Sequence, residues 1–183
     1  MSMTLNPVNE AAFQKAVQSL ETLNRAAVFH PTGTGKSCIA WKVVEAHPQT
    51  TFFWLVAGAQ RLALRQAELT RYNGGTLPGN VRFCDCEKLA AATPEQWVRL
   101  GEQKPGCIVL DCYHELSAVC WAQSVQKLLR MCPQAKVLGL GVPNGAPVCA
   151  AAQELFADCI VSHMTVAEAM AAGTMPVPSA YAA

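Results

Sequence analysis

The segment Val28–Ile39, with the sequence VFHPTGTGKSCI, limits the fold of this chain more than any other stretch. It joins a short apolar run, a loop rich in glycine and threonine, and a Lys-Ser pair that opens a second apolar segment. Gly33 and Gly35 can adopt positive φ angles, so that successive backbone N–H groups of the loop turn toward one anion. A helix starting near Lys36 adds its free N–H groups and the positive end of its dipole. The pattern therefore predicts a strand, a phosphate-binding loop and a helix, in that order.

The loop also carries the side chains that such a site uses. Gly35-Lys36-Ser37 matches the end of the pattern Gly-x₄-Gly-Lys-Ser/Thr, while His30 stands where its first glycine is expected. Lys36 would reach the β and γ phosphates of a nucleotide, and the Ser37 hydroxyl would bind Mg²⁺. His30 is either a structural residue at the end of the strand or a further phosphate contact. The predicted nucleotide-binding residues are Thr32, Gly33, Thr34, Gly35, Lys36 and Ser37.

Apolar strands alternate with helices along the rest of the chain. The predicted strands are residues 26–30, 51–57, 81–84, 106–111, 135–140 and 159–161. The predicted helices are residues 9–24, 36–46, 60–72, 86–92, 93–100, 117–131, 148–156 and 165–171. Because the strands are apolar throughout rather than alternating, the pattern predicts an α/β fold in which helices cover both faces of a mostly parallel sheet.

Composition narrows the classes of protein that remain. A chain of 183 residues with 51% hydrophobic residues suits one domain with a full core. Its net charge of +1 gives no overall bias toward nucleic acid or anionic membranes. The N-terminal sequence lacks the basic and apolar regions of a signal peptide, and no apolar run is long enough to span a membrane. The nine cysteines are an odd number, which favours reduced thiols in a cytoplasmic protein.

A second chemical group follows the strand 106–111, which ends on the carboxylate of Asp111. The carboxyl ends of parallel strands meet at one edge of the sheet, where the phosphate-binding loop also lies. Asp111 would therefore hold Mg²⁺ through its water shell, opposite Ser37. Both groups can converge on one ion if the strand 135–140 lies between the strands 26–30 and 106–111, and this order is the prediction.

Several of these motifs resemble those of a known family. Asp111-Cys112-Tyr113-His114 resembles the DExH box of superfamily 2 DEAD/DEAH-box helicases, and residues 31–37, PTGTGKS, resemble motif I of that superfamily. Residues 53–56, followed by Arg61, stand where motif Ia is expected, and residues 155–158 and 165–178 resemble the end of the first RecA-like domain in restriction-type helicases. The resemblance covers nearly the whole chain. It implies that residues 1–183 form a single RecA-like P-loop NTPase domain that binds ATP and Mg²⁺.

The resemblance implies catalytic roles for Lys36, Asp111 and His114, but the sequence departs from the family in three places. Cys112 stands at the position of the catalytic glutamate. Motif III is reduced to Gly-Val-Pro at residues 141–143, and no second RecA-like domain, the source of arginines for the γ phosphate, is found in these residues. The family therefore implies ATP binding more strongly than hydrolysis, and we expect hydrolysis by this chain alone to be weak or absent.

The same resemblance bears on partners. Arg61 and Arg65 correspond to a region that faces the nucleic-acid backbone in the family, although a solvated helix face has the same pattern. The expected partners are a nucleotide, DNA or RNA, and a second RecA-like domain or another protein, with no membrane. The alternative is a degenerate, non-enzymatic P-loop module that acts as a nucleotide-responsive or structural interaction domain.

The cysteines allow one further interpretation. Cys84, Cys86, Cys112 and His114 together could supply four ligands to zinc. Structural zinc sites usually separate paired cysteines by two to four residues, whereas both pairs here are separated by one. Zinc is therefore the less favoured interpretation of these residues.

Overall fold

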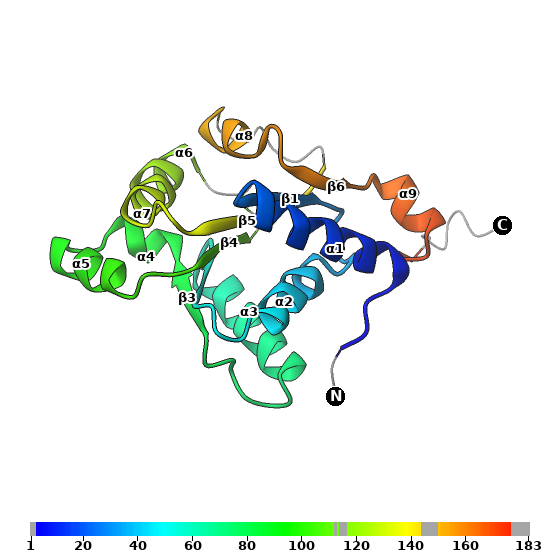
Figure 1. The fold of residues 1–183 in the computed structure, drawn as a ribbon, viewed down its shortest axis with the longest axis horizontal. Helices are drawn as coiled ribbons and strands as arrows, with labels where there is room; N and C mark the ends of the chain where they lie inside the picture. The colour runs from blue at the N-terminus through cyan, green and yellow to red at the C-terminus, as the bar shows by residue number, and fades with distance from the viewer. Residues whose placement is uncertain (1–2, 112, 114–116, 144–149, 177–183) are drawn as a thin grey trace.

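The computed structural model describes residues 3–111, 113, 117–143 and 150–176, and these form one α/β domain (Figure 1). The described strands make a single six-stranded sheet in the order β3-β2-β4-β5-β1-β6, with all neighbouring strands parallel. The strands are β1 (Arg25–Phe29), β2 (Phe52–Val56), β3 (Val81–Asp85), β4 (Cys107–Asp111), β5 (Lys136–Gly141) and β6 (Ile160–His163). The predicted α/β class with a parallel sheet is confirmed.

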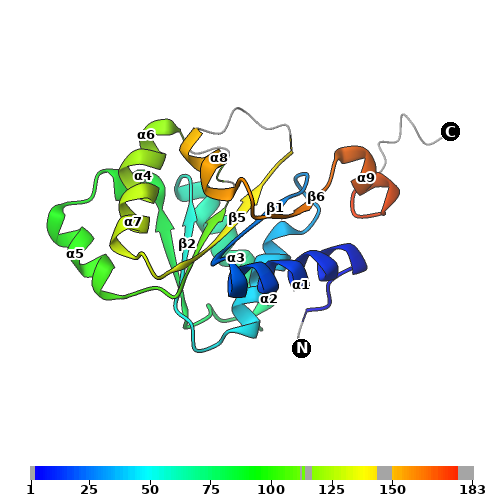
Figure 2. The same ribbon diagram turned by 45° about the horizontal axis from the view of Figure 1, so that its top comes forward.

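Helices cover both faces of this sheet (Figures 1 and 2). One face carries α1 (Pro7–Thr22), α2 (Lys36–Ala46) and α3 (Ala59–Tyr72). The other carries α4 (Cys86–Ala90), α5 (Pro94–Glu102), α6 (Ala118–Cys120), α7 (Gln126–Met131) and α8 (Ala150–Phe156), while α9 (Val166–Ala171) follows β6 beyond the edge of the sheet. Within the described ranges, no helix has the length and apolar character needed to cross a bilayer.

The core is divided by the sheet into two layers, and β2 illustrates why its sequence is apolar throughout. Phe52, Trp54 and Val56 pack in the layer beneath α1, α2 and α3. Phe53 and Leu55, which alternate with them, pack in the opposite layer with the aromatic residues of α5 and α8. All five side chains of this strand are buried, because successive residues of a strand point to opposite faces and both faces are covered.

The order of the central strands brings two separate segments to one edge. β5 lies between β1 and β4, which confirms the predicted order. In register, Val28 of β1 is opposite Leu140 of β5, which is opposite Asp111 of β4. Two strand spacings of ~4.8 Å thus separate the backbones at Val28 and Asp111 by ~10 Å. The loop that follows β1 therefore lies at the same edge of the sheet as the end of β4.

Two helix predictions had different outcomes. The helix predicted at 117–131 is interrupted, because a π-helical segment, Trp121–Val125, separates α6 from α7. Within that segment the Ser124 hydroxyl donates to the carbonyl of Cys86 at 2.7 Å and so fixes the helix to the start of α4. The predicted cap of the last helix is confirmed, since Thr165 and Glu168 form a reciprocal capping box at α9.

A substitution at Gly139 of β5 tests how tightly the core layer that contains Phe53, Leu55 and Phe156 is packed. A Cβ atom at Gly139 would lie 2.7 Å from the ring of Phe156, which is buried. We expect Gly139→Ala to lower the free energy of unfolding by about 1–3 kcal/mol, as is typical of overpacked cores. Urea unfolding measures this, and Gly79→Ala is the control, because a Cβ there has no atom within 4 Å. Equal stability of the two variants would contradict this account of the packing.

Candidate functional site

The loop between β1 and α2 has the conformation that its glycines predict. Gly33 has φ +87° and Gly35 has φ +91°, both in the left-handed region that favours glycine. Gly35 is the residue immediately before α2, and its carbonyl accepts the first backbone bonds of the helix, from Cys38 at 2.9 Å and Ile39 at 3.2 Å. The helix thus begins at Lys36, and its free N–H groups lie at the end of the loop.

The Lys36 side chain folds back into this loop. Its Nζ donates to the carbonyl oxygens of His30 at 2.7 Å and Pro31 at 2.8 Å, and the residue is only 9% exposed. A buried ammonium is costly unless its donors are satisfied, and these two carbonyls accept hydrogen bonds from two of its three N–H groups. The positive charge therefore lies on the concave side of a loop whose backbone bends around it.

Asn9 of α1 holds the loop from the side and was not predicted from the sequence. Its Nδ2 donates to the carbonyl of Thr34 at 2.8 Å, while the Thr34 hydroxyl donates to the carbonyl of Pro31, also at 2.8 Å. A Cβ at Gly35 would lie 2.8 Å from that Nδ2, so glycine is required there by close approach as well as by φ. In the sequence Asn9 resembles any polar residue in the first turn of a helix, and only its 3% exposure distinguishes it.

His30, at the position of the first glycine, is directed away from the loop interior. The side chain is fully buried, and its Nε2 forms a hydrogen bond of 2.7 Å with the hydroxyl of Ser162 on β6. Burial, with smaller contributions from the charges of Lys36 and His163, lowers the pKa of His30 from 6.5 to about 4. The imidazole is therefore neutral at pH 7, and His30 contributes its carbonyl to Lys36.

Asp111 ends β4 with a carboxylate that is 3% exposed. Its Oδ2 accepts hydrogen bonds from Trp54 Nε1 at 3.0 Å and from Arg65 Nε at 2.5 Å. Arg65, on α3, also forms an ion pair with Glu68, one turn further along the helix. The structure thus brings Arg65 to the predicted metal carboxylate, whereas the sequence suggested a nucleic-acid contact for it.

The remaining predicted residues are distributed as follows. Thr32 and Gly33 are exposed at the tip of the loop, and Ser37 is half-buried in the first turn of α2. Arg61 is exposed on α3. Cys112 and His114 lie outside the described residues, so their catalytic roles stay predictions.

The thiols of this edge do not form a metal centre within the described chain. Burial raises the pKa of Cys84 and of Cys86 to about 12, so both keep their protons at pH 7. Among residues 3–111, 113, 117–143 and 150–176, no three His, Cys, Asp or Glu side chains are grouped to hold a metal ion.

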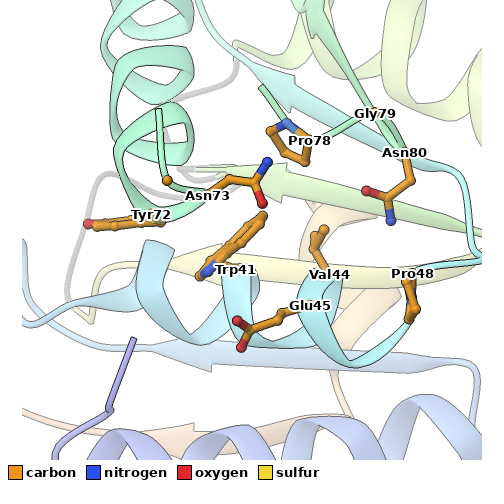
Figure 3. Close-up of a pocket in the computed structure, with 10 residues that line it drawn as sticks. Trp41, Val44, Glu45, Pro48, Tyr72, Asn73, Pro78, Gly79 and Asn80 are labelled. Carbon is orange, nitrogen blue, oxygen red and sulfur yellow. The ribbon is translucent and has the colours of Figure 1, made fainter. Parts of the chain in front are cut away.

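A cavity of about 440 Å³ lies near the amino-terminal ends of the strands, opposite the end where the loop and Asp111 lie (Figure 3). It is formed by the second half of α2, the end of α3 and the segment before β3, with Trp41, Tyr72 and Asn80 among its lining residues. Asn80 precedes β3, whereas the loop between β1 and α2 follows the carboxyl end of β1. This cavity is therefore separate from the loop and from Asp111.

Comparison with known proteins identifies the fold. No protein-family model matches the chain, and no curated protein matches its sequence. Among solved structures, the chain is similar to a part of the ATP-dependent type ISP restriction-modification enzyme LlaBIII bound to DNA, with a TM-score of 0.65 and 13% sequence identity. The match covers 93% of this chain and 16% of that enzyme's chain. The two proteins share a RecA-like fold.

The buried, neutral His30 predicts how stability depends on pH. The unfolded chain protonates this histidine near pH 6.5, whereas the folded protein does so only near pH 4. The free energy of unfolding therefore rises as the pH rises from 4 to 6.5. On acidification from pH 7 to pH 4, protonation of His30 should account for about 2–3 kcal/mol of the loss. Urea unfolding at pH 7 and pH 4 should give a smaller difference for His30→Gln than for the wild type. An unchanged difference would show that His30 binds protons equally in both states.

Proposed function

We propose that this chain is the ATP-binding module of a superfamily 2 helicase-like, nucleic-acid-dependent ATPase, and that it hydrolyses ATP weakly on its own. The observation that carries the proposal is the Lys36 ammonium inside a loop with two left-handed glycines, at the start of α2. The carbonyls that it contacts are neutral acceptors. Phosphate oxygens are charged, and they form stronger bonds with an ammonium. Lys36 is therefore expected to exchange its carbonyl partners for the β and γ phosphates when a nucleotide enters the loop.

The donor set at this edge suits Mg²⁺. The Ser37 hydroxyl and the Asp111 carboxylate are oxygen ligands, the type that this hard cation prefers. Ser37 lies in the first turn of α2 and Asp111 ends β4, so both lie at the end of the sheet where the loop lies. When bound, Mg²⁺ would neutralise charge on the β and γ phosphates. The chain's own residues would bind the phosphates, with Lys36 donating to them and Asn9 fixing the loop.

Weak hydrolysis follows from the residue at position 112. The resemblance assigns this position to the base that orients the attacking water, and here it is a cysteine. A thiol is a poor hydrogen-bond acceptor and is neutral near pH 7, so it cannot replace a carboxylate in this role. Loss of a positioned base typically costs ~10²–10⁴-fold in rate. Arginines of a second RecA-like domain would contribute a further ~10³–10⁵-fold in the family's mechanism.

DNA or RNA is the proposed macromolecular partner. The solved enzyme with the similar fold is described as bound to DNA. In this chain Arg61 projects from α3, exposed to solvent, on the side of the sheet that also carries α2. A second RecA-like domain or another protein would supply the rest of the nucleic-acid path.

The second candidate is a degenerate, non-enzymatic module whose nucleotide site serves as a structural or regulatory contact. The ion pair between Arg65 and Asp111 favours it, because the carboxylate expected to hold the metal is already neutralised. The two candidates differ in turnover rather than in nucleotide binding.

Nucleotide binding is tested by Lys36→Ala. Removing the ammonium should weaken ATP or ADP binding by about 1.5–3 kcal/mol, the range for a charge-assisted hydrogen bond. Calorimetry measures the affinity, and urea unfolding checks that the variant is folded. Lys42→Ala is the matched control, since Lys42 lies on the same helix and pairs with Glu45 at 2.5 Å. Equal affinities for the wild type and Lys36→Ala would refute the phosphate-binding assignment.

Hydrolysis is tested by Cys112→Glu. We expect phosphate release by the wild type to be near background, with or without nucleic acid, and Cys112→Glu to raise it modestly by restoring a carboxylate. Steady-state phosphate release is the measurement, and Lys36→Ala gives the background. Robust turnover by the wild type that Lys36→Ala abolishes would mean that another group serves as the base, and the degenerate candidate would be excluded.

A further inference from the structure

The environment of Asp111 differs from that of a carboxylate held ready for a hydrated cation. Among the described residues, the two side-chain donors to Asp111, Trp54 Nε1 and Arg65 Nε, both reach the same oxygen, Oδ2. Trp54 is fully buried and Asp111 is 3% exposed. A charged pair at 2.5 Å in such surroundings is screened little by water, so Arg65 compensates most of the carboxylate charge.

Arg65 is itself held in place. Its NH1 group forms an ion pair with Glu68 on the same helix, and the Arg65 side chain is only 17% exposed. Because Glu68 already holds the NH1 group, Arg65 loses little further freedom on binding Asp111: the guanidinium is planar and its donors are fixed relative to one another. The contact therefore joins β2, α3 and β4 through one carboxylate.

This position of the guanidinium affects any divalent cation that approaches Asp111. A cation held through that carboxylate would lie within a few ångströms of a fixed positive charge. Like charges at such a separation repel strongly even at an effective dielectric constant of about 20. The metal must therefore either displace Arg65 from Oδ2 or bind against its charge, and both reduce its affinity.

We propose that Arg65 competes with a divalent cation for Asp111, so that the chain in this conformation binds the metal poorly. The proposal deepens the nucleotide-binding function and rests on it for the role of Asp111 as the metal residue. Arg65 thus lowers the affinity of the site for a divalent cation. In this interpretation the strand order brings Asp111 close to the loop, while α3 supplies the Arg65 guanidinium that occupies the carboxylate in place of the metal.

The test uses Mn²⁺ alone as the probe, without nucleotide. The paramagnetic resonance signal of free Mn²⁺ reports how much of the ion is bound by the wild type and by Arg65→Ala. We expect the apparent Kd for Mn²⁺ to be at least about tenfold lower in Arg65→Ala, because a nearby positive charge has been removed. Arg71→Ala is the matched control, since Arg71 lies over the Tyr72 ring at the far end of α3, and it should bind Mn²⁺ as the wild type does.

Two further variants keep the result interpretable. Arg65→Met removes the charge but keeps the apolar stem, so it gives the same measurement if Arg65→Ala is poorly folded. Adding Asp111→Asn to either variant should raise the Kd back to or above the wild-type value, because the gained site requires the carboxylate.

Equal Kd values in the wild type and both Arg65 variants, including no binding by any of them, would overturn the proposal. So would tight Mn²⁺ binding that survives Asp111→Asn. Because no nucleotide is present, these outcomes are independent of the Lys36→Ala experiment, and a failure of nucleotide binding would be recognised separately.

Discussion

The parallel pairing of β5 with both β1 and β4 is the constraint on which the rest of this structure depends. It aligns Val28, Leu140 and Asp111 across three strands, so that a loop and a carboxylate far apart in sequence meet at one edge. Parallel strands need crossover helices, and those helices bury both faces of the sheet. The same pairing therefore explains the apolar strands, the two core layers and the position of the candidate site.

Lys36, Asp111 and His30 are all buried at the carboxyl ends of the strands, and the cost of burying each is reduced in a different way. The Lys36 ammonium donates hydrogen bonds to two loop carbonyls. The Asp111 carboxylate accepts hydrogen bonds from Trp54 and Arg65. Burial, with a smaller effect of the neighbouring Lys36 charge, lowers the pKa of His30 to about 4, so this side chain is neutral at pH 7 instead. A buried group can retain charge only with compensating partners, and these partners determine what the site can bind.

Much of the fold could be predicted from the sequence because it follows from local patterns. The strands follow from continuous apolar runs and most helices from apolar periodicity, and the start of α2 at Lys36 follows from the glycines before it. The break at Trp121–Val125 could not be predicted, because its sequence continues the helical pattern and the extra residue per turn is set by packing. The role of Arg65 was also missed, since motif spacing gives its position along α3 but not the carboxylate that it meets.

The sequence by itself determined the order of elements, the glycine-containing loop before α2 and the acid at the end of β4, because each depends on neighbouring residues or on a pattern along the chain. It also predicted the order of the central strands, since the loop after β1 and Asp111 at the end of β4 were expected to bind the same ion. Only the tertiary structure decided that Asn9 holds the loop, that His30 turns toward Ser162 and that Arg65 neutralises Asp111. These contacts join residues between 25 and 132 positions apart, and no local pattern encodes which side chains fold against one another.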